Sequence, residues 1–318
     1  MAEMIAVGVD VGGTKIAFTA ADRNGQVLTE FTERTNARED ALITIGRIAE
    51  GIERVAQEAG LPVAGVGVAC PGPVDPKTGV AIKAFNLGWK NVPLRDALSA
   101  RLKLEAPIWL QNDVKAAALG EMIFGTARGE NDFVYLAIGT GLGSAAVSNG
   151  QIINGVNGWA MEVGHMSLNP KGRPCTCGNF GCAEMYVSGK GFLAGAADHM
   201  LSKPEYRDST ITTHRVLELA KRGDTLARTV ADEAADALGV VMAWCAVTIN
   251  PSMIVIGGGL GSAAYDLLIP GATLAMRTRI LPEVYNALKI VKATVQTSAL
   301  GPAALVWHGL NEELPAGT

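Results

Sequence analysis

Short apolar runs alternate with longer amphipathic stretches along the first part of the chain. Residues 4–21 place apolar and small side chains on both sides of a glycine turn, and Asn24-Gly25 is a hairpin signal. Isoleucines recur near helical spacing within residues 39–59, whereas residues 63–70 form an apolar run of the length of a buried strand. The pattern predicts a strand, a turn and a strand, followed by a helix and another strand.

The same alternation continues through the middle of the chain. Residues 93–103 and 114–124 suit helices, and residues 107–111 between them suit a strand. Residues 133–153 again consist of a strand, a glycine loop and a strand, in the same plan as residues 4–31. This similarity of plan indicates an internal duplication.

The last third of the chain contains the longest apolar stretch. Residues 225–248 fit an amphipathic helix, residues 253–256 a buried strand and residues 302–312 a final helix. The apolar stretch 238–260 approaches the length of a membrane span, but Asn250-Pro251 interrupts it. We therefore expect a buried helix followed by a buried strand, and no membrane partner.

The composition narrows the class of protein. The chain has 318 residues with 48% hydrophobic side chains, which is enough for a substantial core and two ordinary domains. It carries 27 basic and 31 acidic side chains without a basic run, so nucleic acid is not expected as the main partner. The first apolar run leads into glycines rather than a cleavage site, which predicts a cytoplasmic location. In that compartment the five cysteines would be metal ligands or free thiols.

The most specific motif is a cluster of soft metal ligands. It consists of His165, Cys175, Cys177 and Cys182. Three thiolates and one imidazole make a complete tetrahedral set for structural Zn²⁺, and two glycines before the last cysteine let the chain turn tightly. Glu162 and Glu184 flank the cluster and exceed what such a centre needs, so we interpret them as acceptors for sugar hydroxyls. Solvated surface acids, and a nucleic-acid-binding zinc ribbon for the cluster alone, are the alternatives.

Three glycine-rich turns at the ends of apolar strands are candidate phosphate cradles. They comprise Asp10, Gly12, Gly13, Thr14 and Lys15; Gly139, Thr140, Gly141 and Gly143; and Gly257, Gly258 and Gly259. Uncovered backbone amides approach phosphate oxygens closely, and a carboxylate such as Asp10 fits there chiefly when Mg²⁺ lies between it and the phosphate. A plain hairpin turn is the alternative explanation for any one of these segments, but it does not readily explain all three. None of them has the Walker or dinucleotide-fold pattern.

Asn112-Asp113 stands between a predicted strand and a predicted helix, at a strand's carboxyl end. Taken alone, the pair is explained best as a helix cap. Phosphoryl transfer to an alcohol, however, needs one carboxylate that takes the hydroxyl proton, and Asp113 is the best candidate for that base. Asn86 and Trp89 lie in a predicted loop and supply an amide and an aromatic ring that suit a polyhydroxylated ligand, although loop asparagines more often form turns.

Together these residues resemble the ROK family of bacterial sugar kinases and repressors, which includes glucokinases, fructokinases and N-acetylmannosamine kinases. The resemblance covers nearly the whole chain and rests on the three glycine turns, the zinc cluster through Glu184, and the segments Pro71-Gly72-Pro73, Asn86-Leu87-Gly88-Trp89, Asn112-Asp113, Glu162-Val163-Gly164-His165 and Asn250-Pro251. It implies an α/β, actin-like ATPase (ribonuclease H-like) fold with an active-site cleft between two domains. The smaller domain would span 1–113 with a helix returning at 302–318, and the larger domain, with the zinc cluster, would span 114–301.

The resemblance also implies roles for individual residues. Asp113 would be the general base, while other sugar hydroxyls would be held by Asn86, Asn112, Glu162, His165 and Glu184. His165 would bind Zn²⁺ through one ring nitrogen and face the sugar with the other, so the metal would be structural. Two positions depart from the family pattern, Ser144 and Met161. Met161 adds bulk beside the sugar loop and bears on substrate preference.

We therefore predict an ATP- and Mg²⁺-dependent kinase that binds a sugar and a nucleotide, with glucose phosphorylated at its 6-hydroxyl. A kinase of N-acetylmannosamine or another amino sugar is the alternative, because the same residues would bind the shared hydroxyls. A sugar-responsive repressor is disfavoured, since only nine residues precede Asp10, too few for a helix-turn-helix. The family implies a homodimer or homotetramer, and polyphosphate instead of ATP stays open as the donor.

Overall fold

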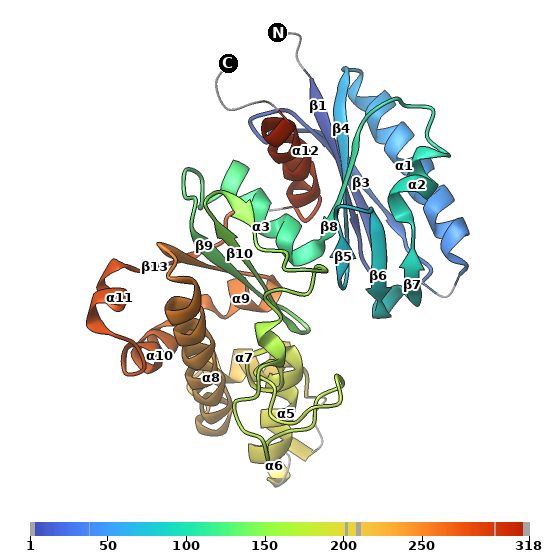
Figure 1. The fold of residues 1–318 in the computed structure, drawn as a ribbon. Helices are drawn as coiled ribbons and strands as arrows, with labels where there is room; N and C mark the ends of the chain where they lie inside the picture. Colours follow the sequence, from blue (N-terminus) through green and yellow to red (C-terminus); the bar gives the residue numbers. More distant parts are fainter. Residues whose placement is uncertain (1–3, 38, 201–202, 208–210, 296, 314–318) are drawn as a thin grey trace. The chain divides into compact units, whose positions relative to one another are not determined.

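The structure is a computed structural model and describes residues 4–37, 39–200, 203–207, 211–295 and 297–313 (Figure 1). Contacts divide the chain into two compact units. Unit 1 comprises Met1–Glu130, Ile152–Ala160 and Thr294–Thr318, and unit 2 comprises Asn131–Gln151 and Met161–Ala293.

Unit 1 is built on a five-stranded sheet with the strand order β3-β2-β1-β4-β8. Its strands are β1 (Ile5–Val11), β2 (Lys15–Ala21), β3 (Val27–Arg34), β4 (Val63–Cys70) and β8 (Ile108–Asn112). A separate three-stranded sheet consists of β5 (Val74–Asp75), β6 (Val80–Ala84) and β7 (Trp89–Val92). The helices are α1 (Ala41–Ala59), η1 (Phe85–Leu87), α2 (Leu94–Ser99), α3 (Asp113–Phe124) and α12 (Leu300–Glu313).

Helix α3 packs directly against α12 in unit 1 (Figure 1). The two helices come so close that a Cβ atom on Gly120 would lie 3.1 Å from the Cα atom of Gly301. This contact explains why α3 groups with unit 1, whereas the boundaries predicted from the sequence assign residues 114–124 to the second domain. The N-terminus of α3, which carries Asp113, is thereby fixed to the sheet of unit 1.

Unit 2 repeats the sheet plan of unit 1, with the strand order β11-β10-β9-β12-β13. Its strands are β9 (Phe133–Ile138), β10 (Leu142–Ser148), β11 (Gln151–Ile152), β12 (Met253–Gly257) and β13 (Lys289–Lys292), and the boundary with unit 1 falls within β11, after Gln151. The helices are η2 (Val163–His165), α4 (Glu184–Val187), α5 (Gly189–His199), α6 (Pro204–Arg207), α7 (Thr213–Lys221), α8 (Thr225–Ile249), α9 (Gly259–Ala263), α10 (Tyr265–Arg277) and α11 (Pro282–Ala287). In both sheets the first strand pairs antiparallel with the second and parallel with a later one, as the predicted duplication requires.

The apolar stretch 238–260 forms the end of α8 and strand β12, as the sequence predicts. Asn250 ends α8 in the left-handed conformation, with φ of 52°, and its backbone N–H bonds to the carbonyl of Ala246. Among the described residues, no helix combines the length and the apolarity needed to cross a membrane.

Candidate active site

The first glycine turn joins β1 to β2 at one end of the unit 1 sheet. Asp10 lies near the end of β1, and the Gly12 N–H donates to the Lys15 carbonyl at 2.9 Å, which closes the hairpin. The buried Thr35 supports the turn, because its hydroxyl donates to the Gly12 carbonyl at 2.6 Å. The turn therefore holds its shape through its own backbone and one neighbouring side chain.

Asn86 lies beside this turn. It belongs to η1, and a Cβ atom on Gly13 would lie 3.0 Å from the Asn86 Cβ atom. Trp89, in contrast, does not offer its ring to a ligand. The sequence pattern predicts a loop here, but Trp89 begins strand β7 with only 5% of its surface exposed and belongs to the core of unit 1. The prediction of an aromatic sugar contact at Trp89 is therefore wrong.

Asn112 ends β8 and caps α3. Its side-chain oxygen accepts from the backbone N–H groups of Val114 and Lys115 at 3.0 and 3.1 Å. Its Nδ2 donates to the Gly72 carbonyl at 3.0 Å and to Asp113 Oδ1 at 2.9 Å. An amide has two donor hydrogens and one acceptor oxygen, so these bonds occupy both donors and the oxygen. The geometry favours a positioning role for Asn112 toward Asp113, and its predicted sugar contact stays a prediction.

Asp113 is the first residue of α3 and has the electrostatics of a general base. Its Oδ1 also accepts from the Val114 N–H at 2.9 Å. Desolvation, followed by the nearby charge of Asp10, raises the pKa of Asp113 from 3.8 to about 7, although hydrogen bonds from Val114 and Asn112 lower it. A base whose pKa lies near neutrality combines a deprotonated population with a useful affinity for a proton.

Asp10 belongs to the same environment. Burial raises the pKa of Asp10, while a hydrogen bond from Ser298 and the charge of Lys15 act in the opposite direction. A partly buried carboxylate beside a glycine turn is a fitting ligand, directly or through water, for Mg²⁺. A divalent cation there would also reduce the repulsion between Asp10 and Asp113.

The second and third glycine turns lie side by side in unit 2. The second follows β9, and its Gly139 N–H donates to the Gly141 carbonyl at 2.9 Å. The third follows β12, which pairs with β9 in parallel. Gly258 has φ of 79°, and a Cβ atom on it would lie 2.4 Å from the Ile138 carbonyl oxygen. Only glycine fits so close to Ile138. Because β9 and β12 are parallel neighbours, the turns that follow them lie at the same end of the sheet.

Glu184 connects the segment of the four candidate metal ligands to the second glycine turn. Its carboxylate lies directly beneath that turn, since Oε2 accepts from the Leu142 N–H at 3.1 Å. A Cβ atom on Gly141 would lie 2.4 Å from the same oxygen. The other oxygen, Oε1, accepts from the Lys190 ammonium at 2.7 Å. Each carboxylate oxygen has two lone-pair sites, so Glu184 retains capacity for a sugar hydroxyl.

The four predicted metal ligands converge in unit 2. One ligand atom from each of His165, Cys175, Cys177 and Cys182 lies within 4.8 Å of all the others. The Cys175 Sγ is 3.8 Å from His165 Nδ1, and the Cys177 Sγ is 3.6 Å from the Cys182 Sγ. Zinc–sulfur bonds of about 2.3 Å in tetrahedral geometry separate two sulfurs by about 3.8 Å. The donor set and its spacing therefore fit Zn²⁺, with Nδ1 as the histidine ligand.

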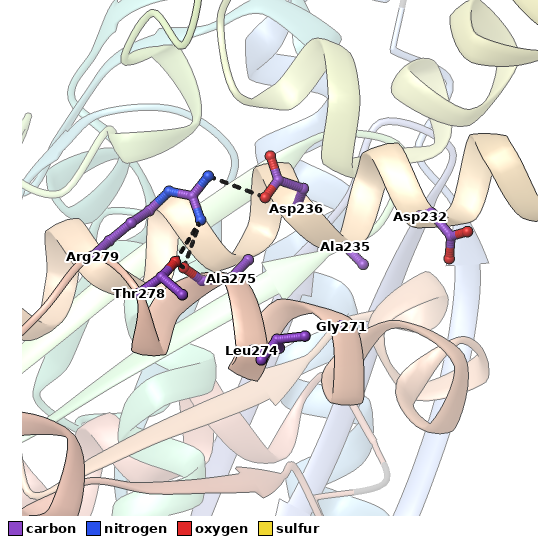
Figure 2. A pocket seen from close by; sticks show the side chains of 8 residues that line it. All are labelled: Asp232, Ala235, Asp236, Gly271, Leu274, Ala275, Thr278 and Arg279. Atoms are coloured by element: carbon purple, nitrogen blue, oxygen red, sulfur yellow. Dashed lines mark hydrogen bonds and ion pairs between the residues drawn. The ribbon is translucent and has the colours of Figure 1, made fainter. Parts of the chain in front are cut away.

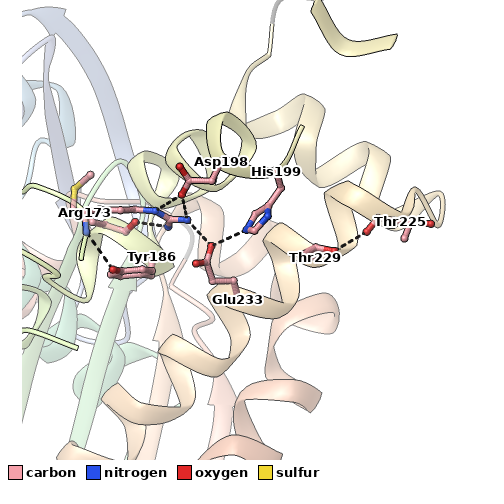
Figure 3. Close-up of polar contacts among 8 residues, drawn as sticks. Arg173, Tyr186, Asp198, His199, Thr225, Thr229 and Glu233 are labelled. Atoms are coloured by element: carbon pink, nitrogen blue, oxygen red, sulfur yellow. Dashed lines mark hydrogen bonds and ion pairs between the residues drawn. The ribbon is translucent and has the colours of Figure 1, made fainter. Parts of the chain in front are cut away.

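Arg173 anchors the segment between the candidate metal ligands His165 and Cys175 to two helices, and no sequence motif identifies it (Figure 3). Its guanidinium donates to Asp198 on α5 at 2.7 Å and to Glu233 on α8 at 2.6 Å. It also donates to the Met185 carbonyl at 2.9 Å and lies over the Tyr186 ring, 4.6 Å from its centroid. The partners are separated from Arg173 by up to 60 residues, so no local spacing could reveal them.

The two departures from the family pattern contact each other. Met161 has φ of 71°, a left-handed conformation that is strained for a residue with a side chain. The Ser144 hydroxyl donates a hydrogen bond to the Met161 carbonyl. Glu162 follows with an exposed side chain, and its carbonyl accepts from the His165 N–H at 3.0 Å. Ser144 thus holds the backbone that presents Glu162.

The predicted site residues therefore fall into two groups. Unit 1 carries the first glycine turn with Asn86, Asn112 and Asp113, and unit 2 carries the other two turns with Glu162, Glu184 and the metal ligands. A groove of about 380 Å³ between α8 and α10, lined by residues such as Asp236 and Arg279, includes none of these side chains (Figure 2).

Comparisons with known proteins extend over both units. A model of the ROK family matches residues 6–308. A glucokinase of Halalkalibacterium halodurans is 34% identical over 275 residues, which are 83% of this chain and 83% of that protein. A glucokinase of Streptomyces griseus, solved in complex with glucose and AMPPNP, has a TM-score of 0.79 and 30% identity over 95% of this chain and 98% of its own. A xylose repressor of Caldicellulosiruptor bescii is 30% identical over 94% of this chain and 77% of its own length.

The likeness to the Streptomyces griseus structure confirms the α/β, actin-like ATPase fold that the resemblance implied. The similar proteins include both kinases and a repressor, so the fold alone does not define the activity.

Proposed function

The chain belongs to the ROK family, and from this premise we propose that it is a sugar kinase that transfers the terminal phosphoryl group of ATP to the 6-hydroxyl of glucose. The environment of Asp113 carries the proposal. A carboxylate that stands at a strand's carboxyl end, with a pKa near 7, is suited to take a proton from an alcohol. A protein that only binds sugar has no need of such a base.

In this mechanism Asp113 orients the attacking hydroxyl and accepts its proton as the oxygen–phosphorus bond forms. The Val114 amide and the Asn112 side chain bind Oδ1 at 2.9 Å, which leaves Oδ2 as the oxygen that faces the substrate. Phosphoryl transfer requires little further covalent chemistry from the protein. Asn112 acts by fixing the carboxylate, and α12 acts by fixing the helix that carries it.

The glycine turns would hold the phosphates of ATP through backbone N–H groups, with the flanking residues Thr14, Lys15 and Thr140 near them. Mg²⁺, held near Asp10, would neutralise charge on the phosphates. Zn²⁺ held by His165, Cys175, Cys177 and Cys182 would supply no chemistry and would fix the segment from Glu162 to Glu184. Asn86, Glu162, His165 and Glu184 would bind the remaining hydroxyls of the sugar.

Glucose is proposed because two similar proteins are named glucokinases and one was solved with glucose. An amino-sugar kinase is the alternative, since Met161 adds side-chain bulk directly before Glu162. A coupled assay of ADP release with glucose, mannose, fructose, N-acetylmannosamine and N-acetylglucosamine separates the two. Turnover with an amino sugar well above that with glucose would replace the substrate assignment. Absence of turnover with every sugar, together with tight sugar binding, would favour a regulator like the xylose repressor.

A further inference from the structure

The contacts of Glu184 reach beyond the sugar site. Glu184 follows the metal ligand Cys182 by two residues, so its backbone is tied to the zinc cluster. Glu184 is buried, with 7% of the residue's surface exposed, and its carboxylate accepts from the Leu142 N–H at the end of the second glycine turn. One carboxylate is thus shared between the wall that would hold the sugar and the loop that would hold the phosphates.

Such a carboxylate has an electrostatic cost. A negative charge in contact with the amides of a phosphate-binding turn would repel the phosphates, and burial strengthens that repulsion. Lys190 removes the excess charge, because its ammonium lies 2.7 Å from Glu184 Oε1. The backbone of the same segment also contacts the turn, with the Gly189 N–H donating to the Gly139 carbonyl at 2.8 Å.

We propose that Lys190 is a positioning residue that, through Glu184 and the Leu142 N–H, couples sugar binding to nucleotide binding. A sugar hydroxyl that donates to a free lone pair of Glu184 withdraws negative charge from the carboxylate and so alters its bond to the Leu142 N–H of the glycine turn. The nucleotide in turn fixes that turn and hence the carboxylate beneath it. This inference rests on the proposed function for the identity of the two ligands, but the ion pair and the amide bond that carry it belong to unit 2 alone.

The test is Lys190→Met, which removes the ammonium and retains the length of the side chain. Calorimetric titration measures the Kd of glucose with and without Mg²⁺ and AMPPNP, a non-hydrolysed ATP analogue, in the full chain. The ratio of the two Kd values is the coupling factor. We expect about fivefold or more in the wild type and a value near one in Lys190→Met, because coupling energies between two sites typically correspond to about 5- to 150-fold.

Two further variants separate coupling from general damage. Lys190→Arg keeps the charge and should retain most of the coupling. Arg279→Met removes a guanidinium that donates to Asp236 at 3.1 Å in the groove that includes no predicted site residue, and should leave the coupling unchanged. A coupling factor that is the same in Lys190→Met and the wild type overturns the proposal, as does a wild-type factor of one.

The nucleotide arm keeps this test distinct from the test of the proposed function. Without any sugar, Lys190→Met leaves Glu184 uncompensated beside the turn, so the Kd of Mg²⁺-AMPPNP should rise about threefold to tenfold, and more at low salt. If no sugar binds, the proposed function fails while this measurement still applies. An unchanged AMPPNP affinity, or no AMPPNP binding to the wild type, overturns the coupling role of Lys190.

Discussion

Asp113→Asn should make the protein more stable and, at the same time, far less active as a catalyst. The pKa of Asp113 is raised from 3.8 to about 7, so the folded state disfavours the charged carboxylate. This penalty is absent below the unfolded-state pKa, grows as the pH rises through the interval from 3.8 to about 7, and is complete above it. One pKa unit corresponds to about 1.4 kcal/mol, which gives a penalty of at most about 4 kcal/mol at pH 8 and about 2 kcal/mol at pH 5.

Asparagine removes the charge and keeps an oxygen that accepts from the Val114 N–H. Urea denaturation of the wild type and Asp113→Asn at pH 5 and pH 8 measures the difference in free energy of unfolding. We expect the stability gain of the variant to be larger at pH 8 than at pH 5. A gain that does not depend on pH, or a variant that is less stable at pH 8, would refute the burial and charge argument for Asp113.

Asp132→Asn is the matched control with the opposite sign. Hydrogen bonds from the Asn149 N–H and the Ser148 hydroxyl lower the pKa of Asp132, so its charge stabilises the fold. Its replacement should reduce stability at pH 8 and leave turnover intact.

In contrast, Asp113→Asn should lower kcat by about 100- to 10,000-fold, the usual range for a general base. In the wild type, kcat/KM should fall as the pH drops below about 7, where Asp113 takes up a proton.

Two other perturbations test the sugar side of the site. Met161→Gly should raise the free energy of unfolding by about 1 kcal/mol, because glycine adopts φ of 71° without strain. Equal or lower stability of the variant in chemical denaturation would show that the backbone at Met161 is not strained. Cys177→Ser should abolish the single Zn²⁺ expected per chain in metal analysis and weaken glucose binding more than AMPPNP binding, whereas an equal loss of both affinities would mean that the metal supports the whole fold.

The sequence predicted the elements with strong periodicity and the motifs with fixed spacing. Helices α1, α8 and α12 lie where apolar residues recur at helical spacing, and the four metal ligands meet because three of them are separated by only a few residues. Trp89 shows where this reasoning fails. Its neighbours in sequence resemble a loop, but burial in the core of unit 1 decides its role.

The contacts of the site side chains could not be read from the sequence. Whether Asn112 caps a helix or binds a sugar depends on Gly72, a residue 40 positions away. Glu184 bonds to Leu142, which is 42 positions away in the sequence, and Arg173 bonds to Glu233, which is 60 positions away. Pairings of this kind follow from the packing of whole elements, so they appear only in the folded chain.

The most direct test of the account is the coupled assay of ADP release from Mg²⁺-ATP with glucose, run in parallel on the wild type and Asp113→Asn. The account predicts sugar-dependent turnover by the wild type and a loss of at least about 100-fold in the variant, while both bind glucose with similar affinity. Near-normal turnover by Asp113→Asn, or a wild type that binds glucose without releasing ADP, would contradict it.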